Sequence, residues 1–459
     1  MFRNVKKIHF VGIGGIGMSG IAELLLNLDF EISGSDLHDS DIIQNLVKQG
    51  AKVTTGKHHA KHIADCEVLV YSSAVQSDNP ELIAAKDKGI PVIKRAEMLA
   101  ELIAVKETAI AVSGTHGKTS TSSMIGSVMN AAKHDPTLVV GGLVQTIDTN
   151  SRLGMGDIII VEADEFDRSF LALRPTIAII TNIELEHTDC YANIEELQSA
   201  FLQFCNSVPF YGGVVVCSDS PKINDIIPEI HRPLTKYGLS QDADYRAEKL
   251  KFDEHNTTYT AYYHNKKLGI IKLNVPGKHN VLNSLAAIAL GMEMGIAFDI
   301  IQKGLIEYKG VRRRFEIKGI INDIMIIDDY AHHPTEVLAT LKAARSGWNK
   351  RIVAVFQPHL YTRTRDFYSD FAKSFLESDV LVVTDIYPAR EKKIEGIDGE
   401  LVAKAAIDLG HKNVIYMPEL ENINETLDKI VESGDMVIGI GAGTIWRYIE
   451  QYTEYLRSK

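Results

Sequence analysis

A short run of small residues followed by a lysine offers the clearest chemistry in this sequence. It reads Ser-Gly-Thr-His-Gly-Lys-Thr-Ser over residues 113–120 and follows the apolar run 108–112. A glycine turn between a strand and a helix presents backbone N–H groups and the positive end of the helix dipole to an anion. Lys118 adds a positive charge for β- and γ-phosphates, and the Thr119 hydroxyl is a suitable ligand for Mg²⁺.

This turn departs from the full phosphate-loop pattern at one position, because Val112 stands where that pattern has a glycine. A short glycine turn can also be a tight connection that binds no ligand. We favour a nucleotide phosphate site, which would comprise Gly114, Thr115, His116, Gly117, Lys118, Thr119 and Ser120.

A second glycine turn lies near the start of the chain, after the strand-like run 7–11. Its glycines have the spacing Gly-x-Gly-x-x-Gly, an apolar helical pattern follows them, and an acid ends the next strand-like run, 31–36. This order is typical of a turn that accepts a diphosphate while the acid binds a ribose. NAD and a UDP-sugar satisfy it equally well, because the turn recognises only the diphosphate. The candidate residues are Gly12, Gly14, Gly15, Ile16, Gly17 and Asp36.

Small residues also follow the apolar run 68–71, namely Ser72, Ser73 and Ala74. Ligands of open parallel sheets bind at the carboxyl ends of the strands, so we expect these residues to line the same crevice as the first glycine turn. An ordinary strand-to-helix turn explains them nearly as well.

An acidic cluster ends the apolar run 157–161 and contains Glu162, Asp164, Glu165 and Asp167. So many carboxylates would repel one another without a cation, and Mg²⁺ is the partner expected beside a phosphate loop. A solvated acidic loop is the alternative. His187 follows the next apolar strand, 176–182, which makes it a candidate metal or phosphate contact.

The second half of the chain offers amides, acids and arginines after further apolar runs. Asn280 and Asn283 share one side of a helical turn and suit a base edge, although Asn280 could equally cap the helix. Asp329 follows the strand 324–328 and suits a ribose hydroxyl, and a cationic loop with Arg363 and Arg365 follows the strand-like run 351–356, where an arginine fork could hold a carboxylate. The pair His332 and His333 could instead bind zinc, but no third ligand has suitable spacing.

Apolar runs that alternate with helical patterns must position these residues, which predicts an α/β fold of several domains over 459 residues. The net charge of −11 argues against a non-specific nucleic-acid binder. The four cysteines are far apart and suit reduced thiols rather than disulfides. No apolar run approaches the length of a membrane span, so we expect a cytoplasmic protein without membrane insertion.

Taken together, these motifs resemble the Mur ligase family. The resemblance rests on residues 12–23, 113–119, 162–165, 181–187, 276–280 and 328–336, which lie in the family's order along nearly the whole chain. It implies an N-terminal Rossmann-like UDP-sugar domain (1–107), a central phosphate-loop ATPase domain with a mixed or parallel sheet (108–312) and a C-terminal Rossmann-like domain (313–459). It also favours UDP-N-acetylmuramate over NAD as the ligand of the first glycine turn.

The resemblance further implies roles for individual residues. Lys118, Glu162, His187 and Arg363 would be catalytic, and Thr119, Glu162 and His187 would bind Mg²⁺. His279, Asn280, Asn283, Arg314 and Asp329 would contact ATP. Residues 190–210 contain no lysine, so we expect no carbamoylated lysine there. Many relatives have an arginine where this chain has Leu360, which weakens the expected role of that position.

The activity implied is the ATP-dependent ligation of L-alanine to UDP-N-acetylmuramate through an acyl phosphate, by a monomer or homodimer. Three alternatives remain at this point: a Mur-type ligase that attaches a whole peptide, an NAD-dependent oxidoreductase, and a nucleotide sensor without catalysis. The oxidoreductase would leave the turn at residues 114–119 unexplained, and the sensor would not need the metal-binding residues.

Overall fold

The computed structural model describes residues 5–459 with the exception of residues 64, 73, 146–148, 187–189 and 390. The chain forms two compact units. The first comprises Met1–Glu248, Thr260–Ile271 and Leu282–Tyr308, and the second comprises Lys249–Tyr259, Lys272–Val281 and Lys309–Lys459. Three sheets account for the described strands, with five, ten and six members. The predicted α/β class with three domains is confirmed, whereas the domain limits 1–107, 108–312 and 313–459 stay predictions.

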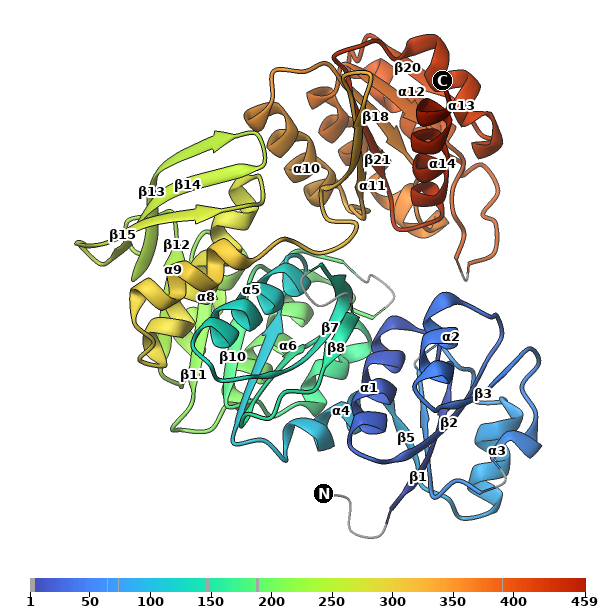
Figure 1. The fold of residues 1–459 in the computed structure, drawn as a ribbon, viewed down its shortest axis with the longest axis vertical. Coiled ribbons are helices and arrows are strands. Elements are labelled where there is room, and N and C mark those ends of the chain that lie inside the picture. Colours follow the sequence, from blue (N-terminus) through green and yellow to red (C-terminus); the bar gives the residue numbers. More distant parts are fainter. Residues whose placement is uncertain (1–4, 64, 73, 146–148, 187–189, 390) are drawn as a thin grey trace. The chain divides into compact units, whose positions relative to one another are not determined.

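The first sheet is parallel throughout and has the order β3-β2-β1-β4-β5. Strand β1 lies between β2 and β4, so the connections diverge at its carboxyl end, where open sheets bind ligands. The strands are β1 (Lys7–Val11), β2 (Glu31–Asp36), β3 (Lys52–Thr55), β4 (Val68–Tyr71) and β5 (Val92–Lys94). The helices around them are α1 (Ile16–Asn27), α2 (Asp41–Lys48), α3 (Pro80–Asp87), α4 (Arg95–Ile103) and the 3₁₀ helix η1 (Ala60–Ile63), as Figure 1 shows.

The second sheet has the order β15-β14-β13-β12-β11-β10-β6-β9-β7-β8. Its pairs from β12 to β7 are parallel, and β8 pairs with β7 in the antiparallel sense. The strands are β6 (Thr108–Ser113), β7 (Thr137–Val144), β8 (Thr149–Arg152), β9 (Ile158–Glu162), β10 (Ile177–Ile180), β11 (Gly213–Cys217), β12 (Leu234–Gly238), β13 (Tyr245–Asp253), β14 (Asn256–Tyr263) and β15 (Lys266–Leu273).

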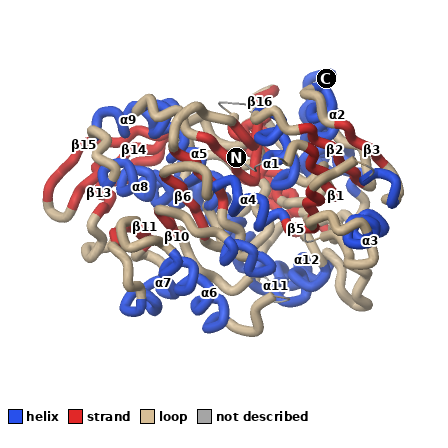
Figure 2. The backbone as a smooth tube through the Cα atoms, turned by 90° about the horizontal axis from the view of Figure 1, so that it is seen from below, coloured by secondary structure: helices blue, strands red, loops and turns tan. Residues whose placement is uncertain are grey.

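Helices cover both faces of this sheet. Figure 2 shows α5, α8 and α9 on one face and α6 and α7 on the other, and α5 packs closely against α9. The helices are α5 (Lys118–Ala131), α6 (Ile194–Ser207), α7 (Pro221–Ile226), α8 (Lys278–Glu293) and α9 (Phe298–Glu307), with the 3₁₀ helices η2 (Phe166–Ala172) and η3 (Ile227–Glu229). Strand β6 is buried on both faces as a result, which explains its continuous apolar sequence.

The third sheet has the order β16-β17-β21-β18-β19-β20, parallel except for the pair β16 and β17. Its strands are β16 (Glu316–Ile321), β17 (Ile324–Asp329), β18 (Ile352–Phe356), β19 (Val380–Val383), β20 (Val414–Tyr416) and β21 (Met436–Ile440). Its helices are α10 (Pro334–Gly347), α11 (Tyr361–Ser374), α12 (Glu400–Asp408), α13 (Ile423–Ile430) and α14 (Ile445–Ser458), with η4 (Phe375–Glu377) and η5 (Leu420–Asn422).

Two apolar layers hold the third sheet between its helices. Successive residues of a strand point to opposite faces, so Ala354 packs with α10, α11 and α12 while Val353 and Val355 pack with α13 and α14. The strands therefore need apolar residues at every position, as their sequences show. None of the helices in the described part of the chain is long and apolar enough to cross a membrane.

Candidate active site

Three neighbouring strands deliver the predicted phosphate and metal residues to one edge of the second sheet. Strand β6 lies between β9 and β10, and its last residues pair with Glu162 of β9 and Ile180 of β10. The phosphate loop, the acidic cluster and the segment after β10 all follow the carboxyl ends of these parallel strands. The sheet thus brings together three motifs that are up to about seventy residues apart in the sequence.

Glycine is required at two positions of the phosphate loop. Gly114 has φ of 131°, and a Cβ atom there would lie 2.1 Å from Oγ1 of Thr181. Gly117 has φ of 84° where α5 begins, and a Cβ atom there would lie 2.8 Å from Oδ1 of Asn283. Both positions are left-handed and have no room for a side chain, so the glycines shape the loop.

The segment after β10 holds this loop by several hydrogen bonds. The backbone N–H of Thr115 donates to the Asn182 carbonyl (3.1 Å), and that of His116 donates to Oδ1 of Asn182 (2.9 Å). The Thr181 hydroxyl and the Asn182 amide both donate to the His116 carbonyl, at 2.6 and 3.0 Å. The Thr115 hydroxyl exchanges hydrogen bonds with the backbone of Glu184. The loop is consequently fixed in shape before any ligand binds.

Lys118 is held inside this loop by its own backbone and by a buried acid. Its Nζ donates to the Gly114 carbonyl (2.7 Å) and to Oε2 of Glu165 (2.8 Å). Burial opposes the charged amine, but the carboxylates of Glu165 and Asp164 outweigh it and raise the pKa of Lys118. The loop therefore presents a permanent positive charge at the start of α5.

Glu162 and Thr119 form an oxygen pair next to that charge. Glu162 accepts hydrogen bonds from the Gly141 backbone N–H (2.7 Å) and from the Thr119 hydroxyl, and burial raises its pKa. A carboxylate that burial makes costly to ionise gains most from a divalent cation, and carboxylate and hydroxyl oxygens are the ligands Mg²⁺ prefers. These two residues fit the predicted metal role. The third predicted ligand, His187, lies outside the described residues.

The first glycine turn forms at the carboxyl end of β1. The backbone N–H groups of Gly12 and Ile13 donate to the Ser35 carbonyl, at 2.8 and 3.1 Å. The Gly14 N–H donates to Oδ2 of Asp36 (2.9 Å), and a Cβ atom on Gly14 would lie 2.9 Å from the same oxygen. Asp36 thus closes against the turn itself, and its role toward a ribose stays a prediction.

The structure places some of the other residues predicted for this site next to the turn and does not describe all of them. Gly15 caps α1, which begins at Ile16, so the turn opens a helix as expected. Ser72 lies beside the turn, because a Cβ atom on Gly12 would be 3.3 Å from its Oγ. Ala74 is exposed in the following turn, and Ser73 lies outside the described residues.

The predicted ATP contacts of the second unit gather around Arg314. Its Nη1 is 3.4 Å from Oε1 of Glu336. Burial, followed by the positive charge of Arg314, lowers the pKa of His279 to about 4, so this imidazole is neutral near pH 7. Asp329 is buried and accepts hydrogen bonds from the backbone N–H groups of Phe315 (2.7 Å) and Ala331 (2.8 Å). It therefore joins the chain just before β16 to the chain just after β17.

The two predicted amides have different local partners. Asn280 lies in the first turn of α8 and its amide donates to the Pro276 carbonyl (2.8 Å), so this contact is not the helix cap that the alternative predicted. Asn283 lies against Gly117 of the phosphate loop. The adenine role of both residues stays a prediction.

Arg363 lies on the first turn of α11, after β18. Its Nη1 is 3.1 Å from Nδ1 of His359, whose ring stacks with Tyr387 at a centroid distance of 5.8 Å. Leu360 precedes the helix with φ of 70°, an unfavourable conformation for a residue with a Cβ atom. Such strain is typical of functional loops. The turn follows the carboxyl end of β18, and ligands of open parallel sheets bind at that end of the strands.

The zinc alternative for the histidine pair lacks support from the neighbouring contacts. His332 Nδ1 lies 2.9 Å from the Tyr330 carbonyl and 3.3 Å from Glu336 Oε2. The His333 ring packs instead against Phe367, with centroids 5.1 Å apart. The two imidazoles therefore have separate surroundings.

Sequence reasoning missed several residues that shape the site. Glu165 was grouped with the acids but not chosen as the partner of Lys118, and nothing in its position along the chain separates it from Glu162. Asn182 belongs to the motif 181–187, but the sequence assigns it no role in holding the phosphate loop. Arg95 was not considered, yet a Cβ atom on Gly17 would lie 3.1 Å from its Nη1, which brings a guanidinium to the start of α1.

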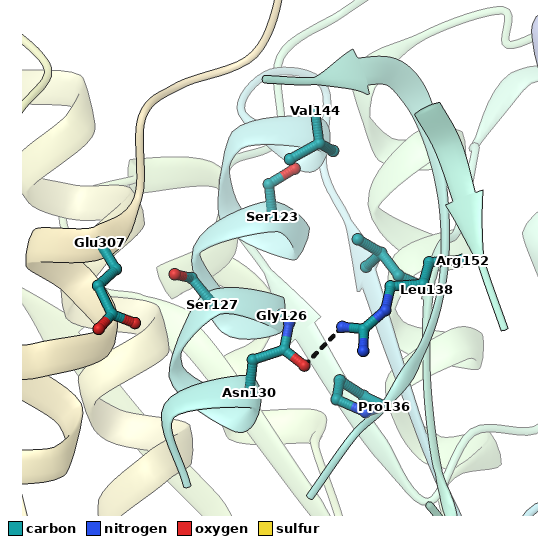
Figure 3. A pocket seen from close by; sticks show the side chains of 9 residues that line it. All are labelled: Ser123, Gly126, Ser127, Asn130, Pro136, Leu138, Val144, Arg152 and Glu307. Atoms are coloured by element: carbon teal, nitrogen blue, oxygen red, sulfur yellow. Dashed lines mark hydrogen bonds between the residues drawn. The ribbon is translucent and has the colours of Figure 1, made fainter. Parts of the chain in front are cut away.

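A cavity of about 220 Å³ lies along α5, the helix that begins at the phosphate loop. Figure 3 shows Glu307 and Arg152 on opposite sides of it, with Gly126 and Ser127 on the helix between them. Arg152 is bound to Asn130 (2.7 Å) and Asp135. The remaining lining comes from residues of α5, β7 and the segment before β7, namely Ser123, Pro136, Leu138 and Val144.

Comparison with known families gives three matches in the order of the sheets. Residues 7–107 match the Mur ligase family catalytic domain, residues 112–291 the Mur ligase middle domain, and residues 313–443 the Mur ligase glutamate ligase domain.

Full-length relatives agree with these matches. The UDP-N-acetylmuramate–L-alanine ligase of Geotalea daltonii is 48% identical, covering 100% of this chain and 99% of that protein. The enzyme of the same name from Syntrophus aciditrophicus is 50% identical over 97% of this chain and 92% of its own length.

Among solved structures, the UDP-N-acetylmuramate-alanine ligase of Thermotoga maritima is 29% identical and superposes with a TM-score of 0.85 over 99% of this chain and 100% of its own. A murein peptide ligase of Psychrobacter arcticus shares the fold at 22% identity, with a TM-score of 0.73 over 98% of both chains. Since three Mur ligase domains match along the chain, and relatives with about half of their residues identical cover nearly its whole length, the chain belongs to the Mur ligase family.

Proposed function

We propose that this Mur ligase joins L-alanine to the lactyl carboxylate of UDP-N-acetylmuramate with consumption of ATP. The full-length similarity to ligases of that name supports the choice of substrates. The observation that carries the phosphoryl-transfer step is the ionised Lys118 inside a prearranged glycine loop. Peptidoglycan precursor synthesis is the process that such a ligase serves.

The chemistry follows from the weakness of a carboxylate as an electrophile. Transfer of the γ-phosphoryl group of ATP to a carboxylate oxygen gives an acyl phosphate and releases ADP. The uncharged amine of L-alanine then attacks the acyl carbon, and phosphate leaves from the tetrahedral intermediate. The protein contributes positioning and charge stabilisation and needs no nucleophile of its own.

Lys118 would follow the charge of the transferred group. Its Nζ lies within the loop that presents backbone N–H groups, so phosphate oxygens entering there would meet both the amine and those donors. The contact with Glu165 holds the side chain in place until then. The other residues of the turn, Gly114 to Ser120, would bind phosphate oxygens through their backbone.

Mg²⁺ is part of this proposal. Thr119, Glu162 and His187 would hold it, and the ion would supply charge neutralisation on the phosphates of ATP. Thr119 and Glu162 are already hydrogen-bonded to each other, so an oxygen pair is in place for it.

The remaining predicted residues receive roles by the same proposal. The first glycine turn with Asp36 and Ser72–Ala74 would bind the UDP-sugar. His279, Asn280, Asn283, Arg314 and Asp329 would contact ATP. Arg363 would bind the carboxylate of L-alanine through its planar fork, which leaves the amine free to attack.

Replacing Lys118 tests the proposal directly. Lys118→Ala should lower phosphate release with UDP-N-acetylmuramate, L-alanine and ATP by at least about a thousandfold, since it removes the charge that follows the transferred group. The matched control is Lys222→Ala, an exposed lysine of the same sheet region that pairs with Asp225. Near-normal turnover of Lys118→Ala would contradict the assignment of the loop.

A peptide-attaching ligase is the second candidate, because murein peptide ligases share this fold over nearly the whole chain. The two candidates differ in the acceptor amine. Competition between L-alanine and an L-alanyl tripeptide, followed by mass analysis of the product, distinguishes them. We expect L-alanine to be incorporated. The NAD-dependent alternative has no support from the family assignment.

A further inference from the structure

A buried carboxylate surrounded by three histidines lies beside the first sheet and has no part in the proposed chemistry. Glu81 belongs to α3 and is fully buried. Its Oε2 accepts from His9 Nε2 (2.8 Å), while its Oε1 accepts from Nδ1 of His58 (3.0 Å) and of His62 (2.9 Å). The histidines come from β1, from the segment after β3 and from η1, so only the folded domain assembles the cluster.

The cluster is built around an ionised acid. Burial alone would raise the pKa of Glu81, but hydrogen bonds from His9, His62 and Ser35 outweigh it and lower the pKa to about 2. A buried ionised carboxylate requires partners that donate hydrogen bonds to it. The three histidines supply those donors.

Ser35 connects this cluster to the first glycine turn. Its hydroxyl donates to Oε2 of Glu81 (2.8 Å). Its carbonyl accepts the backbone N–H groups of Gly12 and Ile13, which open the turn. One residue therefore contacts the buried acid through its side chain and the turn through its backbone.

We propose that Glu81 is a positioning residue for the sugar-nucleotide site, acting through Ser35 on the turn at Gly12. The inference rests on the proposed function, because it takes the ligand of this turn to be UDP-N-acetylmuramate. Glu81 is fully buried and is separated from the turn by Ser35.

Calorimetric titration of the full chain with UDP-N-acetylmuramate, without ATP, tests the inference. Glu81→Gln keeps the shape of the side chain, removes its charge and so weakens the hydrogen bond that holds the Ser35 hydroxyl. We expect its affinity for the sugar nucleotide to fall about tenfold. In steady-state assays, KM for the sugar nucleotide should rise while kcat and KM for ATP change less than about twofold.

Two further variants separate positioning from general stability. Ser35→Ala removes only the hydroxyl link and should raise KM for the sugar nucleotide even if Glu81→Gln does not fold. Glu67→Gln is the matched control, because this acid accepts the backbone N–H groups of Lys6 (2.6 Å) and Lys7 (2.9 Å) at the other end of β1. That variant should retain the affinity and the KM of the unmodified protein for the sugar nucleotide.

The outcomes distinguish this inference from the proposed function. If the unmodified protein does not bind UDP-N-acetylmuramate, the proposed function is wrong. If it binds, but Glu81→Gln folds and keeps the same affinity, or Ser35→Ala leaves KM for the sugar nucleotide unchanged, the positioning role of Glu81 is wrong.

Discussion

Lys118 is ionised and partnered in the protein before any nucleotide binds. Glu165 is buried, and its contact with the amine at 2.8 Å is what allows a lysine to remain charged in so enclosed a turn. The phosphate oxygens of a bound nucleotide would carry more negative charge near this amine than Glu165 alone does. Lys118 can therefore pair with Glu165 in the loop without nucleotide and with phosphate when nucleotide is bound.

Glu165→Gln tests this exchange of partners. Removing the charge leaves Lys118 without its principal counter-ion, so the free energy of unfolding should fall by about 3 kcal/mol. Added ATP with Mg²⁺ should recover most of that loss, because its phosphates replace the missing carboxylate. Urea denaturation with and without nucleotide measures both effects. An equal loss in the two conditions would contradict the exchange.

His279 predicts a pH dependence of stability. Burial, and after it the charge of Arg314, lowers its pKa to about 4, whereas the ordinary pKa of a histidine in an unfolded chain is 6.5. The unfolded chain thus binds the extra proton first, and stability is lost as the pH falls from 6.5 toward about 4, with no contribution above that range. His279→Gln should remove about 2 to 3 kcal/mol of this loss at pH 4 relative to pH 7.5. Urea denaturation at both pH values measures this difference. An equal loss of unfolding free energy between pH 7.5 and pH 4 in both proteins would argue against it.

At the scale of elements, α5 joins the phosphate loop to the interior of its domain. Two of its serine hydroxyls donate to backbone carbonyls: Ser123 to Thr119 (2.7 Å) and Ser127 to Gly304 of α9 (2.7 Å). Small residues let α9 approach closely, and they leave the cavity of Figure 3 along the helix. The helix that presents the loop is consequently anchored by its middle as well as by its first turn.

Two glycines of these helices should respond in opposite ways to alanine. A Cβ atom on Gly126 would make ordinary contacts with Leu138 at 3.5 Å, so Gly126→Ala should stabilise the protein by about 0.5 to 1 kcal/mol through helix propensity. A Cβ atom on Gly304 would lie 2.6 Å from the backbone Cα of Val128, so Gly304→Ala should destabilise it by about 1 to 3 kcal/mol. Thermal denaturation of the pair gives the sign, and the same sign for both would refute the packing described.

At the scale of the whole molecule, the proposed reaction needs ligands on more than one sheet. The phosphoryl donor would bind at the edge formed by β6, β9 and β10, and the acceptor carboxylate belongs to the ligand of the turn after β1. ATP alone has only water as an acceptor. We expect ADP and phosphate to appear at the full rate only when UDP-N-acetylmuramate is present, as a coupled assay with each substrate omitted in turn would show. Full-rate hydrolysis of ATP alone would contradict this order.

Much of the fold was predictable because its signals are local. Strand and helix patterns, glycine turns and the acids after apolar runs depend on neighbouring residues, so the α/β class followed from periodicity. The number of three domains came from the resemblance to the Mur ligase family. The placement of Gly114, Lys118 and Glu162 at one edge followed as well, since parallel strands align their carboxyl ends. Ser73 and His187 lie outside the described residues, so their roles stay predictions.

By itself, the sequence determined which residue types stand at the strand ends and hence which chemistry the edge can support. Only the tertiary structure decided which partners they take. Glu165 rather than Glu162 binds Lys118, Asn283 lies against Gly117, and Glu81 gathers three histidines and Ser35. Each choice depends on burial and on contacts between segments that are distant in sequence. No local pattern records such contacts, because the free energy of a buried polar group is set by whatever the fold places beside it.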